Sequence, residues 1–378
     1  MTRTVLLCAG GTGGHLFPAE AVATVLEERG WRVELATDHR VGAYGKDFPA
    51  TASHVVPSGT PSGRGAVGKA TAGVKLGWGL VRALGLVGRV KPDVAAGFGG
   101  YPTIPPILAA RLRGVPTVIH DQNAVLGRAN RLLARLAKRI ATATSALTLP
   151  AALQEKAVLT GNPVRPAVRE AAAVPYHPPQ PDGPVNLLIF GGSQGARFLS
   201  EAIPAAISKL GPTLRGRLRI TQQCRTEDLP SVEAAYRGLG IEAELAPFFA
   251  GLPMMIARSH LVIARSGATT VAELGVIGRP AVLIPLPGAI DQDQRANAET
   301  LASAGGAWVY EEKTLGVRQL AADITDILSN PERLEAAAAG AGSTGRADGA
   351  DRLADLIEEV AGFRQPAPEA AAERSTEA

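Results

Sequence analysis

Gly-Gly-Thr-Gly-Gly-His, at residues 10–15, is the stretch from which the fold can be predicted. The apolar run Val5–Ala9 precedes it, and a helical pattern follows from about residue 17 to residue 29. A strand, a glycine turn and a helix in this order direct backbone N–H groups at an anion. The dinucleotide-binding fingerprint G-x-G-x-x-G is not met, because Leu16 stands where its third glycine should be. The turn therefore predicts a phosphate site with His15 at its end.

The same pattern recurs in the second half of the chain. The apolar run 185–190 leads into the glycine turn 191–195 and then into a helical pattern from about Ala196. Apolar runs alternate with helical patterns throughout, which predicts a doubly wound α/β fold with parallel sheets. We expect strands at about 4–9, 33–37, 93–97, 116–120 and 139–143 in the first half, and at about 185–190, 217–222, 260–264 and 281–285 in the second.

The repeat predicts two Rossmann-like domains. We expect the first to cover residues 1–163 and the second residues 164–345, because the prolines near residues 163–166 interrupt any helix. Residues 346–362 should form a helix that packs back on the first domain, and residues 363–378 a disordered tail. Ligands of such sheets bind at the carboxyl ends of the strands. The cleft between the domains is therefore the expected site.

The net charge of +4 is unevenly distributed over the 378 residues. Residues 1–165 carry +11 and the remainder carries −7. This asymmetry suggests that the first half meets an anionic surface. Nucleic acid is not expected, because aromatic residues make up only 4% and no nucleic-acid motif occurs.

Cysteine usage and the N-terminus limit the class of protein further. The two cysteines, Cys8 and Cys224, support neither a disulfide scaffold nor a zinc site. No signal peptide is expected, because the apolar run after Arg3 ends in glycines. No uninterrupted apolar stretch is expected to span a bilayer. These features fit a reducing cytoplasm.

Residues 74–90 combine apolar side chains with regularly spaced cations. Lys75, Arg82 and Arg89 lie seven residues apart, and Leu76, Trp78 and Leu80 stand between the first two. A core-packed helix with a basic edge is one interpretation. The other is an interfacial helix that inserts apolar side chains into acyl chains and meets anionic headgroups. The positive charge of the first half favours the second.

Two further stretches carry polar groups suited to a site. Residues 265–273 again predict a strand, a turn and a helix start, where Thr269 and Thr270 can donate to an anion. Glu273 can accept both hydroxyls of a ribose, or act as a partner of the helix dipole. His120–Asn123 follow another apolar run. The pair Asp291 and Asp293 could hold a metal ion, although an acidic helix start explains it better.

These motifs together resemble the MurG family of peptidoglycan transferases, which add N-acetylglucosamine to lipid I to make lipid II. The resemblance extends to about residue 360 and implies a GT-B fold. It is carried by 10–15 with Phe17 and Pro18, 99–101, 121–123, 161–165, 191–196, 265–273, Gln294 and Asn297.

The resemblance implies that the second domain holds most of the donor, UDP-N-acetylglucosamine (UDP-GlcNAc). Glu273 would accept the ribose hydroxyls, Arg165 would lie beside the nucleotide, and the backbone of Phe249 would read the uracil. Ser193 would bind a phosphate. The other implied donor contacts are Thr12, Gly13, Gly14, Asn123, Ala268, Thr269, Thr270 and Gln294. The acceptor diphosphate would lie along the glycine turns of the first domain.

The implied reaction is an inverting displacement by the C4 hydroxyl of the acceptor sugar, and it needs a general base. His15 is the first candidate, because an imidazole with a pKa of about 6.5 is largely neutral at pH 7. A structural role in the glycine turn is its alternative. Asp121 is the second candidate, although the family usually has Glu there. No cofactor is implied, and a divalent cation is compatible but not required.

The family's setting implies a peripheral enzyme at the cytoplasmic face of the cell membrane. Its anionic inner leaflet would contact Lys75, Leu76, Trp78, Leu80 and Arg82, with Lys138 and Arg139 nearby. Cell-wall and division proteins would be partners, in keeping with roles in cell shape, cell division and the cell cycle.

Two other functions remain open from the residues alone. An NAD-dependent oxidoreductase would use the opening turn with Asp38 as ribose partner. A non-catalytic membrane protein would bind the UDP-sugar without transferring it.

Overall fold

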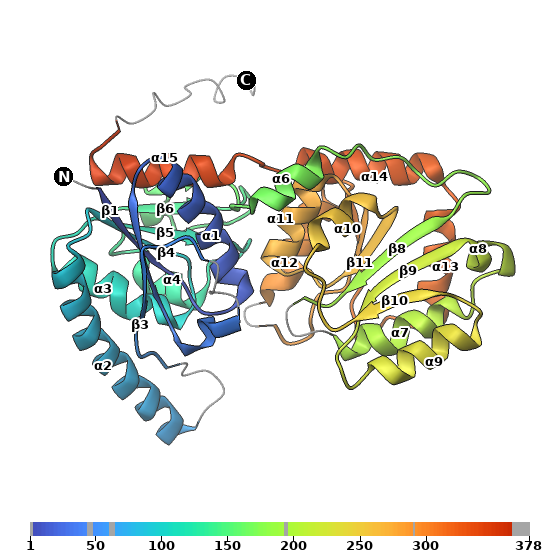
Figure 1. Cartoon of the computed structure of the whole chain (residues 1–378), viewed down its shortest axis with the longest axis horizontal. Coiled ribbons are helices and arrows are strands. Elements are labelled where there is room, and N and C mark those ends of the chain that lie inside the picture. Colours follow the sequence, from blue (N-terminus) through green and yellow to red (C-terminus); the bar gives the residue numbers. More distant parts are fainter. Residues whose placement is uncertain (1–2, 44–47, 60–64, 193–195, 290–291, 365–378) are drawn as a thin grey trace.

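A computed structural model describes residues 3–43, 48–59, 65–192, 196–289 and 292–364. It contains two separate parallel sheets, which lie side by side in Figure 1. The first has the strand order β3-β2-β1-β4-β5-β6-β7 and the second the order β10-β9-β8-β11-β12-β13. The predicted α/β fold with two doubly wound parallel sheets is confirmed.

The first half of the chain forms the first sheet and its helices. Its elements are β1 (Thr4–Cys8), α1 (Gly13–Glu28), β2 (Arg32–Thr37), η1 (His39–Ala43), β3 (Ala52–Val55), α2 (Ala66–Val90), β4 (Val94–Gly97), η2 (Tyr101–Thr103), α3 (Ile104–Leu112), β5 (Thr117–Asp121), α4 (Arg128–Leu133), β6 (Arg139–Thr142), α5 (Ala151–Gln154) and β7 (Ala157–Leu159).

The second half forms the second sheet and the returning C-terminal helix. Its elements are α6 (Pro166–Ala172), β8 (Val185–Phe190), α7 (Arg197–Ile207), α8 (Pro212–Arg217), β9 (Leu218–Gln223), α9 (Leu229–Gly238), β10 (Ala243–Ala246), α10 (Leu252–Arg258), β11 (Leu261–Ala264), α11 (Ala268–Ile277), β12 (Ala281–Leu283), α12 (Asp293–Ala302), β13 (Ala307–Val309), α13 (Val317–Leu328), α14 (Pro331–Ser343) and α15 (Gly349–Ala361).

The nine strands expected from the sequence are all present within a few residues, and four others were missed. The missed strands, β3, β7, β10 and β13, are the edge strands of the two sheets. Strand β3 alternates half-buried and exposed residues, whereas β1 is buried throughout. An edge strand is covered less completely than a central one, so it lacks the continuous apolar run that marked the others.

Helix α15 returns from the second half of the chain and packs against α1 (Figure 1). Arg29 on α1 pairs with Glu358 at 2.8 Å and with Asp355 at 2.7 Å. The indole N–H of Trp31 donates to the other oxygen of Glu358 at 2.9 Å. Glu358 is buried, and a buried carboxylate needs such donors to compensate for its lost hydration. These bonds fix the register of α15 on the first sheet's helices.

Helix α2 is the one segment of the described chain that is long and apolar enough to cross a membrane. The stretch Ala70–Val90 has a mean hydropathy of 1.2, with 28% of it buried. Lys75, Arg82 and Arg89 interrupt this stretch, so the expectation that no uninterrupted apolar stretch spans a bilayer still holds for this helix. Its inner residues Ala83, Leu86 and Val87 are buried in the core beside the first sheet. A helix that crossed a bilayer would lose these contacts, so α2 belongs to the helical layer of that sheet.

His120 ties the end of β5 to the connection between the two halves of the chain. Its Nε2 donates to the carbonyl oxygen of Gly161 at 3.1 Å. The pKa of His120 is lowered to about 4, mainly by burial; the bond to Gly161 opposes the decrease, and the nearby His15 adds a smaller decrease. The folded protein therefore holds a neutral imidazole at this joint.

We predict that His120 makes the protein sensitive to acid. Its folded pKa of about 4 lies below its unfolded value, so the unfolded state takes up a proton first as the pH falls. Between pH 7 and pH 4.5 this costs the wild type about 2–3 kcal/mol of unfolding free energy. His120→Gln, which keeps a donor for Gly161, should remove most of that loss in urea unfolding. The exposed His177→Gln is the control, and equal pH slopes in all three proteins would contradict the prediction.

Candidate active site

A cavity of about 630 Å³ lies between the two glycine-rich strand ends, β1–α1 and β8–α7. This volume is typical of a small-molecule site. Gly13, Gly14 and Phe17 line it from the first half of the chain. The structure gathers most of the predicted donor residues around it, namely Gly13, Gly14, Arg165, Phe249, Ala268, Thr269, Thr270, Glu273 and Gln294.

The remaining predicted residues do not line this cavity. Thr12 is the N-cap residue of α1, and its side chain makes no capping hydrogen bond. His15 lies in the first turn of α1, Asp121 is the last residue of β5, and Asn123 lies in the loop that follows β5. Ser193 lies outside the described residues, as does Asp291.

Arg165 connects both halves of the chain at the floor of the cavity. Its guanidinium lies 4.1 Å from the centre of the Phe17 ring on α1 and 3.2 Å from Glu273 on α11. Glu273 is only 3% exposed. Burial raises the pKa of the Glu273 carboxyl, while the charge and hydrogen bond of Arg165 oppose the shift. Arg165 therefore favours the anionic form of a carboxylate that faces the cavity.

The start of α11 presents unoccupied donors to the same cavity. Gly267 is its N-cap residue, with no side-chain cap, so the first N–H groups of the helix remain available. The buried hydroxyl of Thr269 has no hydrogen-bond partner within the described chain. The Gln294 side chain is held by Leu286, whose N–H donates to Oε1 at 3.0 Å. A helix start with free donors is suited to a phosphate or diphosphate.

His15 is enclosed by the glycines that follow β4. A Cβ atom at Gly99 or Gly100 would lie only 3.2–3.3 Å from the imidazole, and both glycines have positive φ. Glycine is required there for the backbone conformation and for the close approach. Burial lowers the pKa of His15, and Asp121 is the largest opposing influence. The imidazole is therefore neutral near pH 7, as a general base must be.

Asp121 is engaged by the loop that follows it. It is 1% exposed, and it accepts hydrogen bonds from the N–H groups of Asn123 at 3.1 Å and Gly127 at 2.8 Å, and from Asn130 at 3.0 Å. Burial raises the pKa of its carboxyl, and these three bonds oppose the rise. Both oxygens therefore hold residues 121–130 in place.

Asn297 on α12 also joins the two halves of the chain. Its Nδ2 donates to Oδ1 of Asn123 at 3.0 Å, and its Oδ1 accepts from the N–H of Ala124 at 2.9 Å. Asn297 is 3% exposed. We call this pair of bonds the asparagine latch. The amide of Asn123, predicted to meet the sugar, is thus partly occupied in this state.

Several residues that line the cavity were not predicted to act in the site. Arg265, at the end of β11, forms an ion pair with Glu312 and donates to the carbonyls of Ile284 and Pro285. It stood in the 265–273 motif, but its partners are remote in sequence. The ring of Phe198 lies 5.8 Å from its guanidinium. No sequence pattern singled out the other unpredicted lining residues, such as Gln223, Arg225, Phe248 and Leu286.

The structure argues against the use of Asp38 as a ribose partner, and Asp291 of the possible metal pair lies outside the described residues. Asp38 is 3% exposed and is bound by Arg40 at 2.6 Å and 2.9 Å, so it does not present a free carboxylate to a ribose. Asp293 starts α12 and accepts from the N–H of Gln294. Within the described chain, no group of three or more histidine, cysteine or acidic side chains is placed to hold a metal ion.

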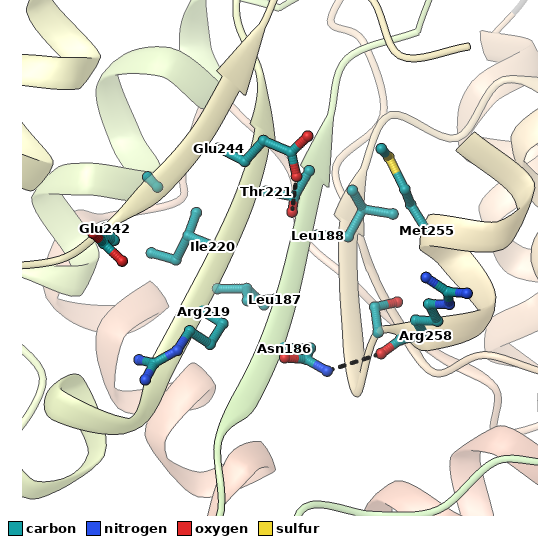
Figure 2. Close-up of a pocket in the computed structure, with 12 residues that line it drawn as sticks. Asn186, Leu187, Leu188, Arg219, Ile220, Thr221, Glu242, Glu244, Met255 and Arg258 are labelled. Carbon is teal, nitrogen blue, oxygen red and sulfur yellow. Dashed lines mark hydrogen bonds between the residues drawn. The ribbon is translucent and has the colours of Figure 1, made fainter. Parts of the chain in front are cut away.

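A second cavity of similar size, about 660 Å³, lies elsewhere on the second sheet (Figure 2). Its residues come from the first parts of β8, β9 and β10 and from the end of α10. Thr221 donates to Glu244 at 3.4 Å, and Asn186 donates to the carbonyl of Arg258 at 3.1 Å. None of the predicted site residues lines it. The cavity that contains Glu273 is therefore the candidate active site.

Comparison with protein families matches both halves of the chain. Residues 5–142 match the glycosyltransferase family 28 N-terminal domain, and residues 186–353 match the glycosyltransferase family 28 C-terminal domain. The structure resembles that of Acinetobacter baumannii MurG with a TM-score of 0.77 and 31% identity, over 94% of this chain and 99% of that one. A UDP-GlcNAc 2-epimerase from Neisseria meningitidis, at 15% identity and a TM-score of 0.65 over 96% of this chain and all of that one, shares the fold alone.

Similar proteins from two other bacteria carry one name, UDP-N-acetylglucosamine–N-acetylmuramyl-(pentapeptide) pyrophosphoryl-undecaprenol N-acetylglucosamine transferase. The Methylobacterium nodulans protein is 55% identical over 94% of this chain and 96% of its own length. The Nitrobacter hamburgensis protein is 52% identical over 97% and 99%. The chain therefore belongs to the MurG family of N-acetylglucosaminyltransferases, with the two-domain GT-B fold of that family.

Proposed function

We propose that the cavity around Glu273 and the opening glycine turn carries out the transfer for which the family is named. The enzyme moves N-acetylglucosamine from UDP-GlcNAc to lipid I and so makes lipid II for peptidoglycan. The observation that carries the site assignment is the convergence of Glu273, Arg165 and the free start of α11 on one cavity. Neither the oxidoreductase nor the non-catalytic binding protein is supported.

We assign the donor nucleotide to the second sheet. Glu273 accepts the ribose hydroxyls, because its carboxylate lines the cavity and the adjacent Arg165 favours its anionic form. The start of α11 and its threonines bind the diphosphate, with Ser193 as a further phosphate contact. Phe249 lies at the uracil end, and Gln294 contacts the sugar. Thr12, Gly13 and Gly14 complete the site from the first sheet, and Asn123 reaches the sugar once the latch opens.

We assign the general base to His15. Its ring is held against Gly99 and Gly100, and its lowered pKa keeps it neutral. Asp121 acts as a positioning residue, because its two oxygens already bind its own loop and it is almost fully buried. As the acceptor hydroxyl attacks the anomeric carbon, the leaving UDP gains negative charge. Arg165 and the α11 start stabilise that charge.

We propose that the enzyme sits on an anionic membrane surface through α2 and its neighbours. Val74, Trp78 and Val81 are 55–73% exposed, beside the exposed Lys75 and Arg82. Leu112, at the end of the adjoining α3, is also exposed, as are Leu132 and Leu136 at and after the end of α4. Scattered apolar residues are common on surfaces, but a basic apolar helix is typical of membrane contact.

Part of the predicted membrane surface faces the protein instead. Leu80 packs against the core beside the first sheet, and Leu76 is half-buried. Lys138 donates to the carbonyl of Val360 at 3.3 Å, and Arg139 pairs with Glu359 at 3.6 Å. These two cations therefore hold α15. The proposed membrane surface is centred on Trp78, and contacts with cell-wall or division proteins remain a prediction.

We also propose the division of the chain into residues 1–163 and 164–345, with residues 346–362 returning to the first domain. Each sheet lies within one of these spans. The placement of α15 beside α1 supports the last part.

We predict that His15→Ala removes most of the transferase activity. The kcat of UDP release from UDP-GlcNAc, with a short-chain lipid I analogue, should fall on the order of 100-fold or more, because the proton acceptor is gone. The KM for UDP-GlcNAc should change little. In the wild type, kcat should fall only at a pH below the ordinary pKa of histidine. The surface variant His177→Ala is the control, and an unchanged kcat in His15→Ala would exclude this base.

We predict that Glu273→Gln weakens donor binding by about 10- to 100-fold, because hydrogen bonds to a charged acceptor are lost. UDP and 2′-deoxy-UDP separate this effect from a general loss of fold. The wild type should prefer UDP, and the variant should bind the two nucleotides almost equally in calorimetry. A variant that keeps the full preference for UDP would show that another group reads the ribose.

We predict that the double change Trp78→Ala and Val81→Ser lowers binding to vesicles that contain phosphatidylglycerol, by about tenfold. UDP release with a water-soluble acceptor should be unaffected. Val55→Ser, at an equally exposed valine on β3, is the matched control in the same sedimentation assay. Unchanged binding of the double variant would place the membrane surface elsewhere.

A further inference from the structure

A third cavity lies between the two halves of the chain, beside the candidate active site. We call it the hinge cavity; its volume is about 590 Å³. The loops after β5, β6 and β7 line it from the first sheet, and helices α11 and α12 with the segment 343–346 line it from the second half. We propose that it receives the peptide of the acceptor. This inference rests on the proposed function, since the acceptors named for the relatives carry a pentapeptide.

The hinge cavity adjoins the place where the sugars must react. Ala268, at the start of α11, lines both this cavity and the donor cavity. The asparagine latch stands between the two, because Asn297 lines the hinge cavity while Gln294, three residues earlier on α12, lines the donor cavity. In a muramyl sugar the peptide is attached through the lactyl ether on C3, next to the C4 hydroxyl that attacks. The first residue of the peptide must therefore lie close to the boundary between the donor cavity and the hinge cavity.

The lining of the hinge cavity suits a peptide. It carries hydroxyl groups on both sides, at Thr144, Ser145, Thr300, Ser303 and Thr344. The hydroxyls of Thr300, Ser303 and Thr344 donate to backbone carbonyls at 2.7–2.8 Å. Their oxygens can still accept hydrogen bonds from the N–H groups of a peptide. Val271 and Leu301 add apolar wall between them, which suits small aliphatic side chains.

A cation stands at the edge of the hinge cavity. Arg346 is exposed, lines the cavity and forms no ion pair within the described chain. Its stem lies across Gly161, where an added Cβ atom would approach Cβ of Arg346 to 2.9 Å. Gly161 also has a φ of +83°, so a glycine is needed for two reasons. The contact fixes the stem of Arg346 and leaves its guanidinium to bind a carboxylate, such as the one that ends a peptide.

A buried amide in the same wall also lacks a partner. Asn162 lines the cavity and is 7% exposed, and its Oδ1 accepts no hydrogen bond within the described chain. Buried polar groups are normally paired, so an N–H donor from a bound molecule would complete this wall. Each side of the hinge cavity therefore carries a polar group without a partner among the described residues, Asn162 on one and Arg346 on the other. This is expected of a binding site rather than of packing between domains.

The test compares two acceptors that differ only in the peptide. One is a short-chain lipid I analogue with the pentapeptide, and the other has the lactyl carboxyl capped as a simple amide. Arg346→Ala should raise the KM for the first by about tenfold, as expected for one lost charged hydrogen bond. Ser303→Trp, which fills the rim of the cavity, should raise it further. Neither variant should change the KM for the peptide-free acceptor or for UDP-GlcNAc. Arg352→Ala, an exposed arginine on α15 that does not line the cavity, is the control.

The outcomes are distinct. An equal increase in KM for both acceptors would show that the hinge cavity serves domain packing. An unchanged KM for both acceptors would show that the peptide binds at another place. Both results overturn the inference while the transfer reaction itself stands. A wild type that releases UDP with neither acceptor would instead contradict the proposed function. An unchanged KM for UDP-GlcNAc in the variants reports that the fold is intact.

Discussion

The site depends on the contact that Arg165 makes with both halves of the chain. One guanidinium lies over Phe17 of the first half and pairs with Glu273 of the second. Without this cation, a carboxylate that is 3% exposed would favour its neutral form, because burial penalises the charge. The contact that joins the two halves of the chain is therefore also the one that favours the charged form of Glu273.

Sequence patterns predicted the centre of each sheet and failed at the edges. Central strands such as β1 and β11 are buried throughout and so are continuous apolar runs, whereas β3 exposes alternate residues and no residue of β10 is fully buried. The opening glycine turn was predictable because its backbone allows no side chain at Gly11, where a Cβ atom would approach the nitrogen of Val41 to 2.6 Å. Such requirements act on single residues and remain visible in a linear sequence.

Contacts between distant segments were beyond prediction. Asn297 could be seen as part of a motif, but its bonds to Asn123 and Ala124 arise only when the two sheets face each other. The occupation of Asp121 by Gly127 and Asn130 was equally hidden, because a carboxylate after a strand looks the same whether it is free or bonded. Whether such a carboxylate can act on a substrate depends on how many hydrogen-bond donors of the protein already bind it.

The return of α15 to the first sheet has a mechanical consequence. The chain passes between the halves twice, near residues 161–165 and again near 344–348. Asp351 lies close to the second passage and binds Arg169 at 2.7 Å, with Arg29 at 3.8 Å. Because two connections, held together by these ion pairs, join the halves, any rotation of one half against the other has to bend both connections at once.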